Sequence, residues 1–229
     1  MNEVVVAAPQ RVVSATLTKG TTFGLTNGYV APGDEITLPE GRFRVTAVDV
    51  DGWSAVNDHS HTIDITLTAE PNGTAVTCPL PWLLTQIRTT ALALTNAQVV
   101  VGTAMVRNGT LLAQQRAYPP EIAGLWELPG GQVEPNESDK DAVARECQEE
   151  LGVEVKVGET IGPDVALPKG KLLRIYQATL ADPKATPHPH DHAALRWLTA
   201  DQLNSVEWLP ADRVLLPTLK QALQQTPQP

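Results

Sequence analysis

The stretch GGQVEPNESDKDAVARECQEELGV, residues 130–153, decides how the rest of the chain is interpreted. Behind a pair of glycines it carries one acid, then an arginine and three more acids, at Glu137, Arg145, Glu146, Glu149 and Glu150. A solvated helix usually spreads such acids and balances them with lysines, because like charges one turn apart repel. The crowding therefore indicates a site for a divalent cation.

The same stretch predicts a helix from about Ser138 to Leu151. Ser138 is a suitable N-cap with Asp141 three residues later, and Gly152 suits the left-handed position that ends a helix. On a helical wheel the apolar residues form one stripe that would face a sheet: Val143, Ala144, Cys147 and Leu151.

The three acids of this helix project from a single sector of the wheel. Glu146 and Glu150 lie one turn apart, and Glu149 lies about 60° to one side of Glu146. Dense carboxylates suit Mg²⁺ or Mn²⁺, and Arg145, four residues before Glu149, can hold a carboxylate in place. Glu137 would reach a further ligand or a water. The plainer interpretation is a solvated acidic face.

The surrounding sequence predicts alternating strands and helices, which is typical of an α/β or α+β domain. A hairpin comes first: a buried strand over 98–106, a turn at Asn108-Gly109 and a returning strand over 111–115. The later elements are a short strand over 125–129, strands over 153–157, 171–180 and 194–198, a helical turn over 201–203, and a last helix over 211–223, interrupted or bent at Pro217.

Residues 1–78 predict short strands, including one over 11–18, separated by turn signals such as Pro32-Gly33-Asp34. We expect a small all-β domain of unknown role over 1–90, built as an antiparallel sandwich or barrel. Residues 82–94 form either a helix or a linker, and the second domain covers 95–229. His59 and His61 suit a metal site or, more plainly, an exposed polar loop.

Composition limits the kinds of partner. The chain has 229 residues and a formal net charge of −9, which argues against a nucleic-acid polymer bound on a basic face. It contains no apolar run of the length that spans a membrane and no recognisable signal peptide. With only Cys78 and Cys147, far apart in sequence, we expect reduced thiols in a cytoplasmic protein.

The complete spacing G-x5-E-x7-R-E-x2-E-E-x-G is that of a Nudix box, and residues 97–220 resemble a Nudix hydrolase. One departure is Cys147, where the family usually has Ile, Leu or Val. The resemblance implies an α/β/α sandwich with a mixed sheet. It also implies Mg²⁺-dependent hydrolysis of a nucleoside diphosphate linked to another group, so the substrate is a small nucleotide and no membrane is involved.

The resemblance also assigns roles within the box. Glu146, Glu149 and Glu150 would bind the metal, with the carbonyl of Gly130 as a further ligand, while Arg145 would orient the carboxylates. Glu146 is the expected general base. Some family members take the base from a later loop, where Asp191 is this chain's candidate, within a run of alternating histidines that would otherwise suggest a metal site.

Among Nudix hydrolases the chain most resembles the MutT-like group, including its CTP pyrophosphohydrolases. That resemblance makes Arg116 a nucleotide contact and Lys171 a phosphate or sugar contact. Glu127 would face the pocket or pair with Arg145. The expected reaction releases a nucleoside monophosphate and pyrophosphate from a nucleoside triphosphate.

Asp212 is the residue expected to select the base, at a position where members that remove oxidised guanine nucleotides carry Asn. An ionised Asp only accepts hydrogen bonds, so it suits the cytosine N4 amino group. We therefore expect (d)CTP or a modified cytidine nucleotide. The alternatives are 8-oxo-dGTP, ADP-ribose or a dinucleotide, a non-catalytic nucleotide sensor, and a purely structural Asp212 that caps the last helix. The first domain would supply a homodimer interface, cover the pocket or bind another ligand.

Overall fold

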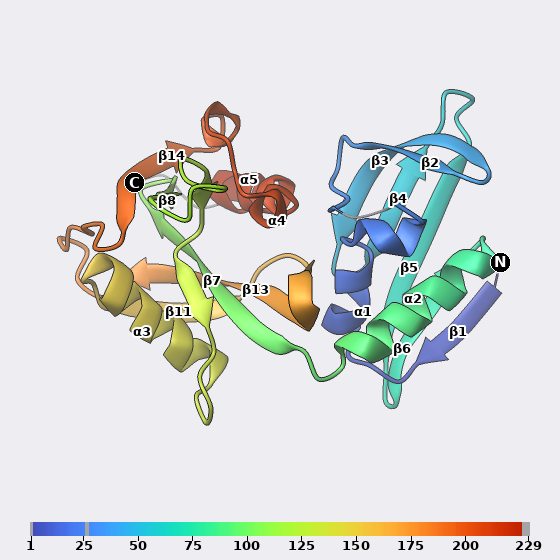
Figure 1. The fold of residues 1–229 in the computed structure, drawn as a ribbon, viewed down its shortest axis with the longest axis horizontal. Helices are drawn as coiled ribbons and strands as arrows, with labels where there is room; N and C mark the ends of the chain where they lie inside the picture. Colours follow the sequence, from blue (N-terminus) through green and yellow to red (C-terminus); the bar gives the residue numbers. More distant parts are fainter. Residues whose placement is uncertain (1, 26–27, 226–229) are drawn as a thin grey trace. The chain divides into compact units, whose positions relative to one another are not determined.

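A computed structural model describes residues 2–25 and 28–225 of the chain. The chain divides into two compact units, each described separately below (Figure 1). Unit 1 comprises Met1–Ala97 with Pro163–Leu172, and unit 2 comprises Gln98–Gly162 with Leu173–Pro229. None of the described helices is both long enough and apolar enough to cross a membrane.

Unit 1 contains an antiparallel sheet of six strands in the order β1-β6-β5-β4-β3-β2. The strands are β1 (Asn2–Val6), β2 (Glu35–Leu38), β3 (Gly41–Asp49), β4 (Gly52–Val56), β5 (Thr62–Glu70) and β6 (Gly73–Cys78). Along β2 and β5 buried and exposed residues alternate, as expected when one face of a sheet packs on a core. The predicted strand-rich N-terminal region is therefore confirmed.

Unit 1 also contains helices, and the strand predicted over 11–18 is wrong. Those residues lie in α1 (Gln10–Thr16), and α2 (Pro81–Leu94) packs against α1, β1 and β6 (Figure 1). Every residue from Val12 to Thr16 is buried, so packing on several sides outweighs the local preference of Val and Thr for strands. A short 3-10 helix, η1 (Gly20–Phe23), brings Phe23 onto Trp53 with ring centroids 4.8 Å apart.

A later segment of the chain completes unit 1. It contains β12 (Val165–Leu167) and η2 (Pro168–Gly170). Arg11 forms an ion pair of 2.9 Å with the fully buried Asp164, and the amide of Ala166 donates to the Thr18 hydroxyl at 3.2 Å. A stretch predicted to belong to the second domain is thus packed within the first unit.

Unit 2 is built on a sheet whose main order is β11-β13-β7-β8-β14. Its strands are β7 (Gln98–Arg107), β8 (Thr110–Arg116), β9 (Trp126–Glu127), β10 (Gly130–Gln132), β11 (Val155–Thr160), β13 (Lys171–Leu180) and β14 (His192–Thr199). The β7–β8 hairpin confirms the predicted turn, with Asn108 and Gly109 both at positive φ. The α+β class predicted from the sequence is confirmed.

The charged stretch forms α3 (Asp139–Leu151), which packs on β7, β10 and β11. The Ser138 side chain accepts from the amide of Asp141, and Gly152 ends the helix in the left-handed conformation, as predicted. The buried residues of α3 are Ala142, Val143, Cys147 and Leu151, so Ala142 replaces the expected Ala144. The box carboxylates lie beside this buried stripe, with Glu146 and Glu150 partly buried and Glu149 exposed.

The last helix is divided, as predicted, but the break lies before Pro217. Helix α4 (Pro210–Arg213) and helix α5 (Leu216–Gln225) are separate elements. Pro217 lies in the first turn of α5, where its missing N–H costs no intrahelical hydrogen bond. The predicted turn over 201–203 corresponds to the short helix η3 (Leu203–Ser205).

Candidate active site

The two glycines of β10 bring the backbone against the carboxylates of α3. A Cβ placed on Gly131 would lie 2.1 Å from Oε1 of Glu146, and one on Gly130 would lie 2.0 Å from the carbonyl oxygen of Val101. Gly130 also has φ of 153°, a region that other residues rarely adopt. These positions therefore exclude side chains, and this exclusion lets the strand pass directly beside Glu146.

Arg145 organises the outer part of the carboxylate cluster. Its guanidinium makes two hydrogen bonds with Glu137, at 2.9 and 3.0 Å, and also donates to Glu146 at 2.8 Å and Glu149 at 3.1 Å. These hydrogen bonds raise the pKa of Arg145 above its usual range and lower that of Glu137. Arg145 thus holds three carboxylates, and Glu137 serves as its partner.

Glu146 and Glu150 lie deeper than Glu149. Burial is the main cause that raises the pKa of both carboxyls, and hydrogen bonding to Arg145 opposes it at Glu146. Oε2 of Glu150 accepts from Nε2 of Gln114 at 3.0 Å and from the amide of Gly130 at 2.9 Å. Two carboxylates are therefore taken out of water beside a single arginine, an arrangement that a cation would stabilise.

A second group of side chains follows the end of β8. Nη1 of Arg116 donates to Oε1 of Glu127 at 2.9 Å, and Nε2 of His192 lies 2.8 Å from the same oxygen. Glu127 therefore pairs with Arg116 and His192 rather than with Arg145. His192 was missed by sequence reasoning, since its run of alternating histidines gave no signal that set this residue apart.

Asp212 is buried, with 5% of its surface exposed, and its Oδ1 accepts from the amide of Leu128 at 3.0 Å. The pKa of this carboxyl is raised to about 7, mainly by burial and also by the charge of nearby Glu127. Asp212 lies inside α4, whose N-cap is Leu209, and it precedes α5. A capping role for Asp212 is therefore wrong; the structure joins it instead to Leu128, two residues before Gly130.

The family model described as NUDIX domain matches residues 96–219 of the chain, more than half of its length. The chain belongs to the Nudix family. It is 46% identical over 129 residues to a Mycobacterium tuberculosis protein named "Putative 8-oxo-dGTP diphosphatase 2", covering 55% of this chain and 90% of that protein. The CTP pyrophosphohydrolase of Escherichia coli is 37% identical over 117 residues, covering 51% and 87%.

Among solved structures, the solution structure of the E. coli ORF135 protein is 35% identical. It covers 56% of this chain and 91% of that one, with a TM-score of 0.48. As a Nudix protein with relatives named diphosphatases and pyrophosphohydrolases, the chain is a hydrolase that acts on small nucleotides. Nudix hydrolases generally need a divalent metal.

The Nudix glutamates fit a divalent cation in their chemistry, because they offer only oxygen acceptors from one face of a helix. In the part of the chain that the structure describes, no three His, Cys, Asp or Glu side chains are grouped closely enough to hold an ion. Arg145 instead binds Glu137, Glu146 and Glu149. Binding a metal therefore requires side-chain movement among the box glutamates.

The histidine loop of this Nudix unit caps the end of α3. The amides of His188 and His190 donate to the carbonyls of Leu151 and Glu150, each at 3.0 Å, and the His190 ring lies 2.6 Å from the carbonyl of Glu149. Asp191 is exposed. Its role as an alternative base stays a prediction, and so does the role of the Gly130 carbonyl. Lys171 falls in the segment grouped with unit 1, so its predicted substrate contact is not tested within this site.

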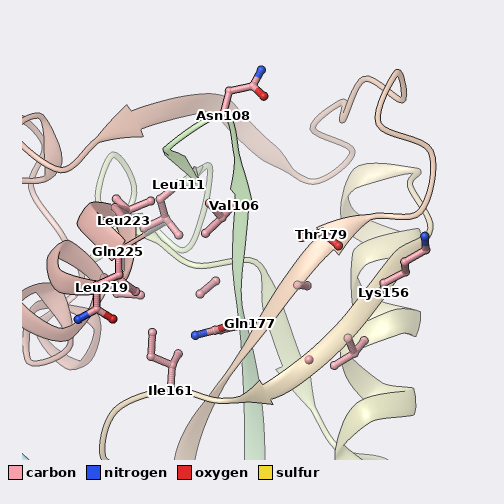
Figure 2. A pocket seen from close by; sticks show the side chains of 15 residues that line it. Val106, Asn108, Leu111, Lys156, Ile161, Gln177, Thr179, Leu219, Leu223 and Gln225 are labelled. Carbon is pink, nitrogen blue, oxygen red and sulfur yellow. The ribbon is translucent and has the colours of Figure 1, made fainter. Parts of the chain in front are cut away.

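A cavity of about 640 Å³ lies apart from the box glutamates, between α5 and the sheet of unit 2 (Figure 2). Its walls include Val106, Leu111, Leu219 and Leu223, and Gln177 points into it (Figure 2). Met105 and Leu112, the strand neighbours of Val106 and Leu111, instead belong to the core under α3. Successive side chains of a strand face opposite ways, so this cavity lies on the other face of the sheet from α3.

Proposed function

We propose that the protein is a cytoplasmic, Mg²⁺-dependent pyrophosphohydrolase that converts a nucleoside triphosphate to a monophosphate and pyrophosphate, with a cytidine nucleotide as its preferred substrate. The reaction is supported above all by the three α3 carboxylates, of which Glu146 and Glu149 accept from Arg145 and Glu150 accepts from the amide of Gly130. Both cysteines are free and buried, consistent with a reducing compartment.

Glu146, Glu149 and Glu150 are the residues that would hold the metal. When bound, Mg²⁺ supplies charge to the phosphate oxygens and lowers the pKa of the attacking water. Glu146, the box carboxylate that lies against Gly131, is the general base in this proposal, and Asp191 is the alternative. Arg145 keeps Glu146 and Glu149 oriented while no cation is bound.

Base preference is proposed to depend on Asp212. In its ionised form this carboxyl accepts the N4 amino hydrogen of cytosine. With a pKa of about 7, Asp212 is also partly protonated near neutral pH, and the protonated form donates to a carbonyl such as O6 of 8-oxoguanine. This second form, together with a relative named as an 8-oxo-dGTP diphosphatase, makes 8-oxo-dGTP the second candidate substrate.

Initial rates on the full chain with Mg²⁺ test this proposal. CTP, dCTP, 5-methyl-dCTP, 8-oxo-dGTP and ADP-ribose are compared, with pyrophosphate release read through pyrophosphatase. We expect the highest kcat/KM for a cytidine nucleotide. Turnover of no substrate would reject the reaction, and a large preference for 8-oxo-dGTP would reject the cytidine assignment.

The same assay at several pH values tests Asp212. Its pKa is raised to about 7, so it becomes ionised as the pH rises through 7. The ratio of kcat/KM for CTP to that for 8-oxo-dGTP should therefore rise about tenfold per pH unit on both sides of pH 7, since a single titration interconverts the ionised form that suits CTP and the protonated form that suits 8-oxo-dGTP. Asp212→Asn, which cannot ionise, should flatten the ratio; an unchanged slope would exclude Asp212 as its source.

A further inference from the structure

His192 is the first residue of β14, and its backbone lies opposite Arg116 of β8. Only 5% of its side chain is exposed. Nε2 lies 2.8 Å from Oε1 of Glu127, and an ionised carboxylate can only accept, so Nε2 carries the hydrogen of this bond. His192 and Arg116 therefore donate to the same oxygen of Glu127.

The other ring nitrogen faces a different part of the site. Nδ1 of His192 is buried without a hydrogen-bond partner, 3.9 Å from Oε1 of Glu150. That distance is too long for a hydrogen bond. A buried polar atom left without a partner costs free energy, so a histidine that served only the core would be expected to satisfy both nitrogens.

Gln114 repeats this pattern on the other oxygen of Glu150. Its Nε2 donates to Oε2 of Glu150, while its own Oε1 is buried without a partner. Glu150 is thus bordered by His192 and Gln114, each of which makes one bond and leaves one polar atom unpaired. His192 alone of these two also reaches Glu127, and so it connects the α3 carboxylates with the pair formed by Arg116 and Glu127.

We propose that His192 is a positioning residue for nucleotide binding: it fixes the carboxylate of Glu127 and, through Glu127, orients the guanidinium of Arg116. The inference rests on the proposed function in treating Arg116 as a nucleotide contact. In this proposal His192 acts through Glu127 and Arg116 and not on the reacting phosphate, so its effect should fall on KM and on binding, and kcat should change little.

Two substitutions of His192 distinguish its hydrogen bond to Glu127 from the space that its side chain fills. His192→Ala removes the hydrogen-bond donor to Glu127. KM for CTP should rise at least about fivefold, because this factor corresponds to part of the free energy of a hydrogen bond to a charged group. The value of kcat should stay within about threefold of wild type. In His192→Gln the side-chain amide can take the place of Nε2, so KM should return to within about twofold. Should the alanine variant fail to fold, His192→Asn replaces it, since its shorter amide does not reach the position of Nε2.

Calorimetry with CTP and with 8-oxo-dGTP in EDTA gives a readout that is independent of turnover. The dissociation constant for the better-bound of the two should increase by the same factor as KM in His192→Ala and recover in His192→Gln. His188→Ala is the matched control, because the exposed His188 ring lies in the same loop and its contact with α3 is made by its backbone. This control should leave KM and the dissociation constant unchanged.

A double-mutant cycle with Glu127→Ala completes the test. If His192 acts through Glu127, the double variant should show the KM of Glu127→Ala alone. Additive effects, an unchanged KM in His192→Ala, a loss confined to kcat, or an equal effect of His188→Ala would each overturn the inference. A wild-type protein that turns over no nucleotide while these binding effects hold would instead overturn the proposed function alone.

Discussion

The two units of the chain bury polar side chains in different ways. In α1 and just after it, Ser14, Thr16 and Thr18 each donate to the carbonyl three residues earlier, at 2.7 to 2.8 Å. In unit 2, two hydrogen bonds to carboxylates join separate segments: Gln114 donates to Glu150, and the Leu128 amide donates to Asp212. The three local bonds of unit 1 satisfy hydroxyls within one short segment, whereas these two bonds of unit 2 hold carboxylates in place.

Buried carboxylates show the same contrast. In unit 1, Asp164 is fully buried and pairs with Arg11 at 2.9 Å. In unit 2, Glu150 takes its hydrogen bonds from Gln114 and the amide of Gly130, and no Lys or Arg of the described residues pairs with it. A desolvated carboxylate without a cation is costly, and its raised pKa reflects that cost. The difference indicates that unit 1 uses its buried charge for folding and unit 2 for binding.

Among the variants that test this difference between the units, the removal of a charge from α3 should have the largest effect. Glu146→Gln should lower kcat at least ~10²-fold, the lower scale for loss of a general base. It should leave the fold intact because Gln has the size of Glu and its amide oxygen can still accept from Arg145. The measurement is pyrophosphate release with Mg²⁺, alongside circular dichroism.

The matched control is Glu159→Gln, since Glu159 is an exposed glutamate of the same unit and pairs with Lys140 at the surface. Its rate should equal that of wild type. A near-wild-type Glu146→Gln would move the base to Asp191, and Asp191→Asn should then carry the loss.

A substitution of Gly131 should have a smaller effect. It tests whether activity depends on the close packing of β10 against the α3 carboxylates. In Gly131→Ala the new methyl group would meet Oε1 of Glu146 at 2.1 Å, so the carboxylate must move. We expect kcat/KM to fall about tenfold, since small displacements of catalytic groups carry penalties of this scale or larger.

Gly158→Ala is the control for this substitution, because a Cβ there would meet its neighbours at ordinary distances, 3.4 Å or more. It should change neither kcat/KM nor the melting temperature appreciably. Equal losses in the two variants would mean that Gly131 matters for strand stability rather than for Glu146.

Sequence patterns predicted what depends on local chemistry. Ser138 and Gly152 mark the ends of α3 by their own side chain and backbone preference, and the Asn108-Gly109 turn defines the β7–β8 hairpin. The single sector of box carboxylates follows from helical periodicity alone. These features needed no knowledge of what packs against them.

The features that were predicted wrongly or missed depend on contacts between residues that are distant in sequence. The strand predicted over 11–18 is a helix because the residues it meets come from α2, β5 and β12. His192 becomes part of the site only because β14 pairs with β8 and brings it opposite Arg116. The pKa of Asp212 is raised mainly by burial, which depends on tertiary packing, and its hydrogen-bond donor, the Leu128 amide, lies 84 positions earlier in the chain. No pattern within a short window carries this information.

The smallest effects should come from unit 1, where buried hydroxyls serve the fold. Thr74→Val keeps the shape of the side chain and removes the hydrogen bond to the Ala8 carbonyl, so it should cost about 1 kcal/mol of unfolding free energy. Thr18→Val should cost more, because Thr18 both donates to the Ala15 carbonyl and accepts from the Ala166 amide. Urea unfolding followed by circular dichroism measures both, and kcat/KM for the preferred nucleotide should stay within about twofold of wild type, well inside the range of a surface change. Either variant could instead remain folded and lower kcat/KM as strongly as Gly131→Ala. The buried hydroxyls of unit 1 would then affect catalysis, and the assignment of folding to unit 1 and binding to unit 2 would be wrong.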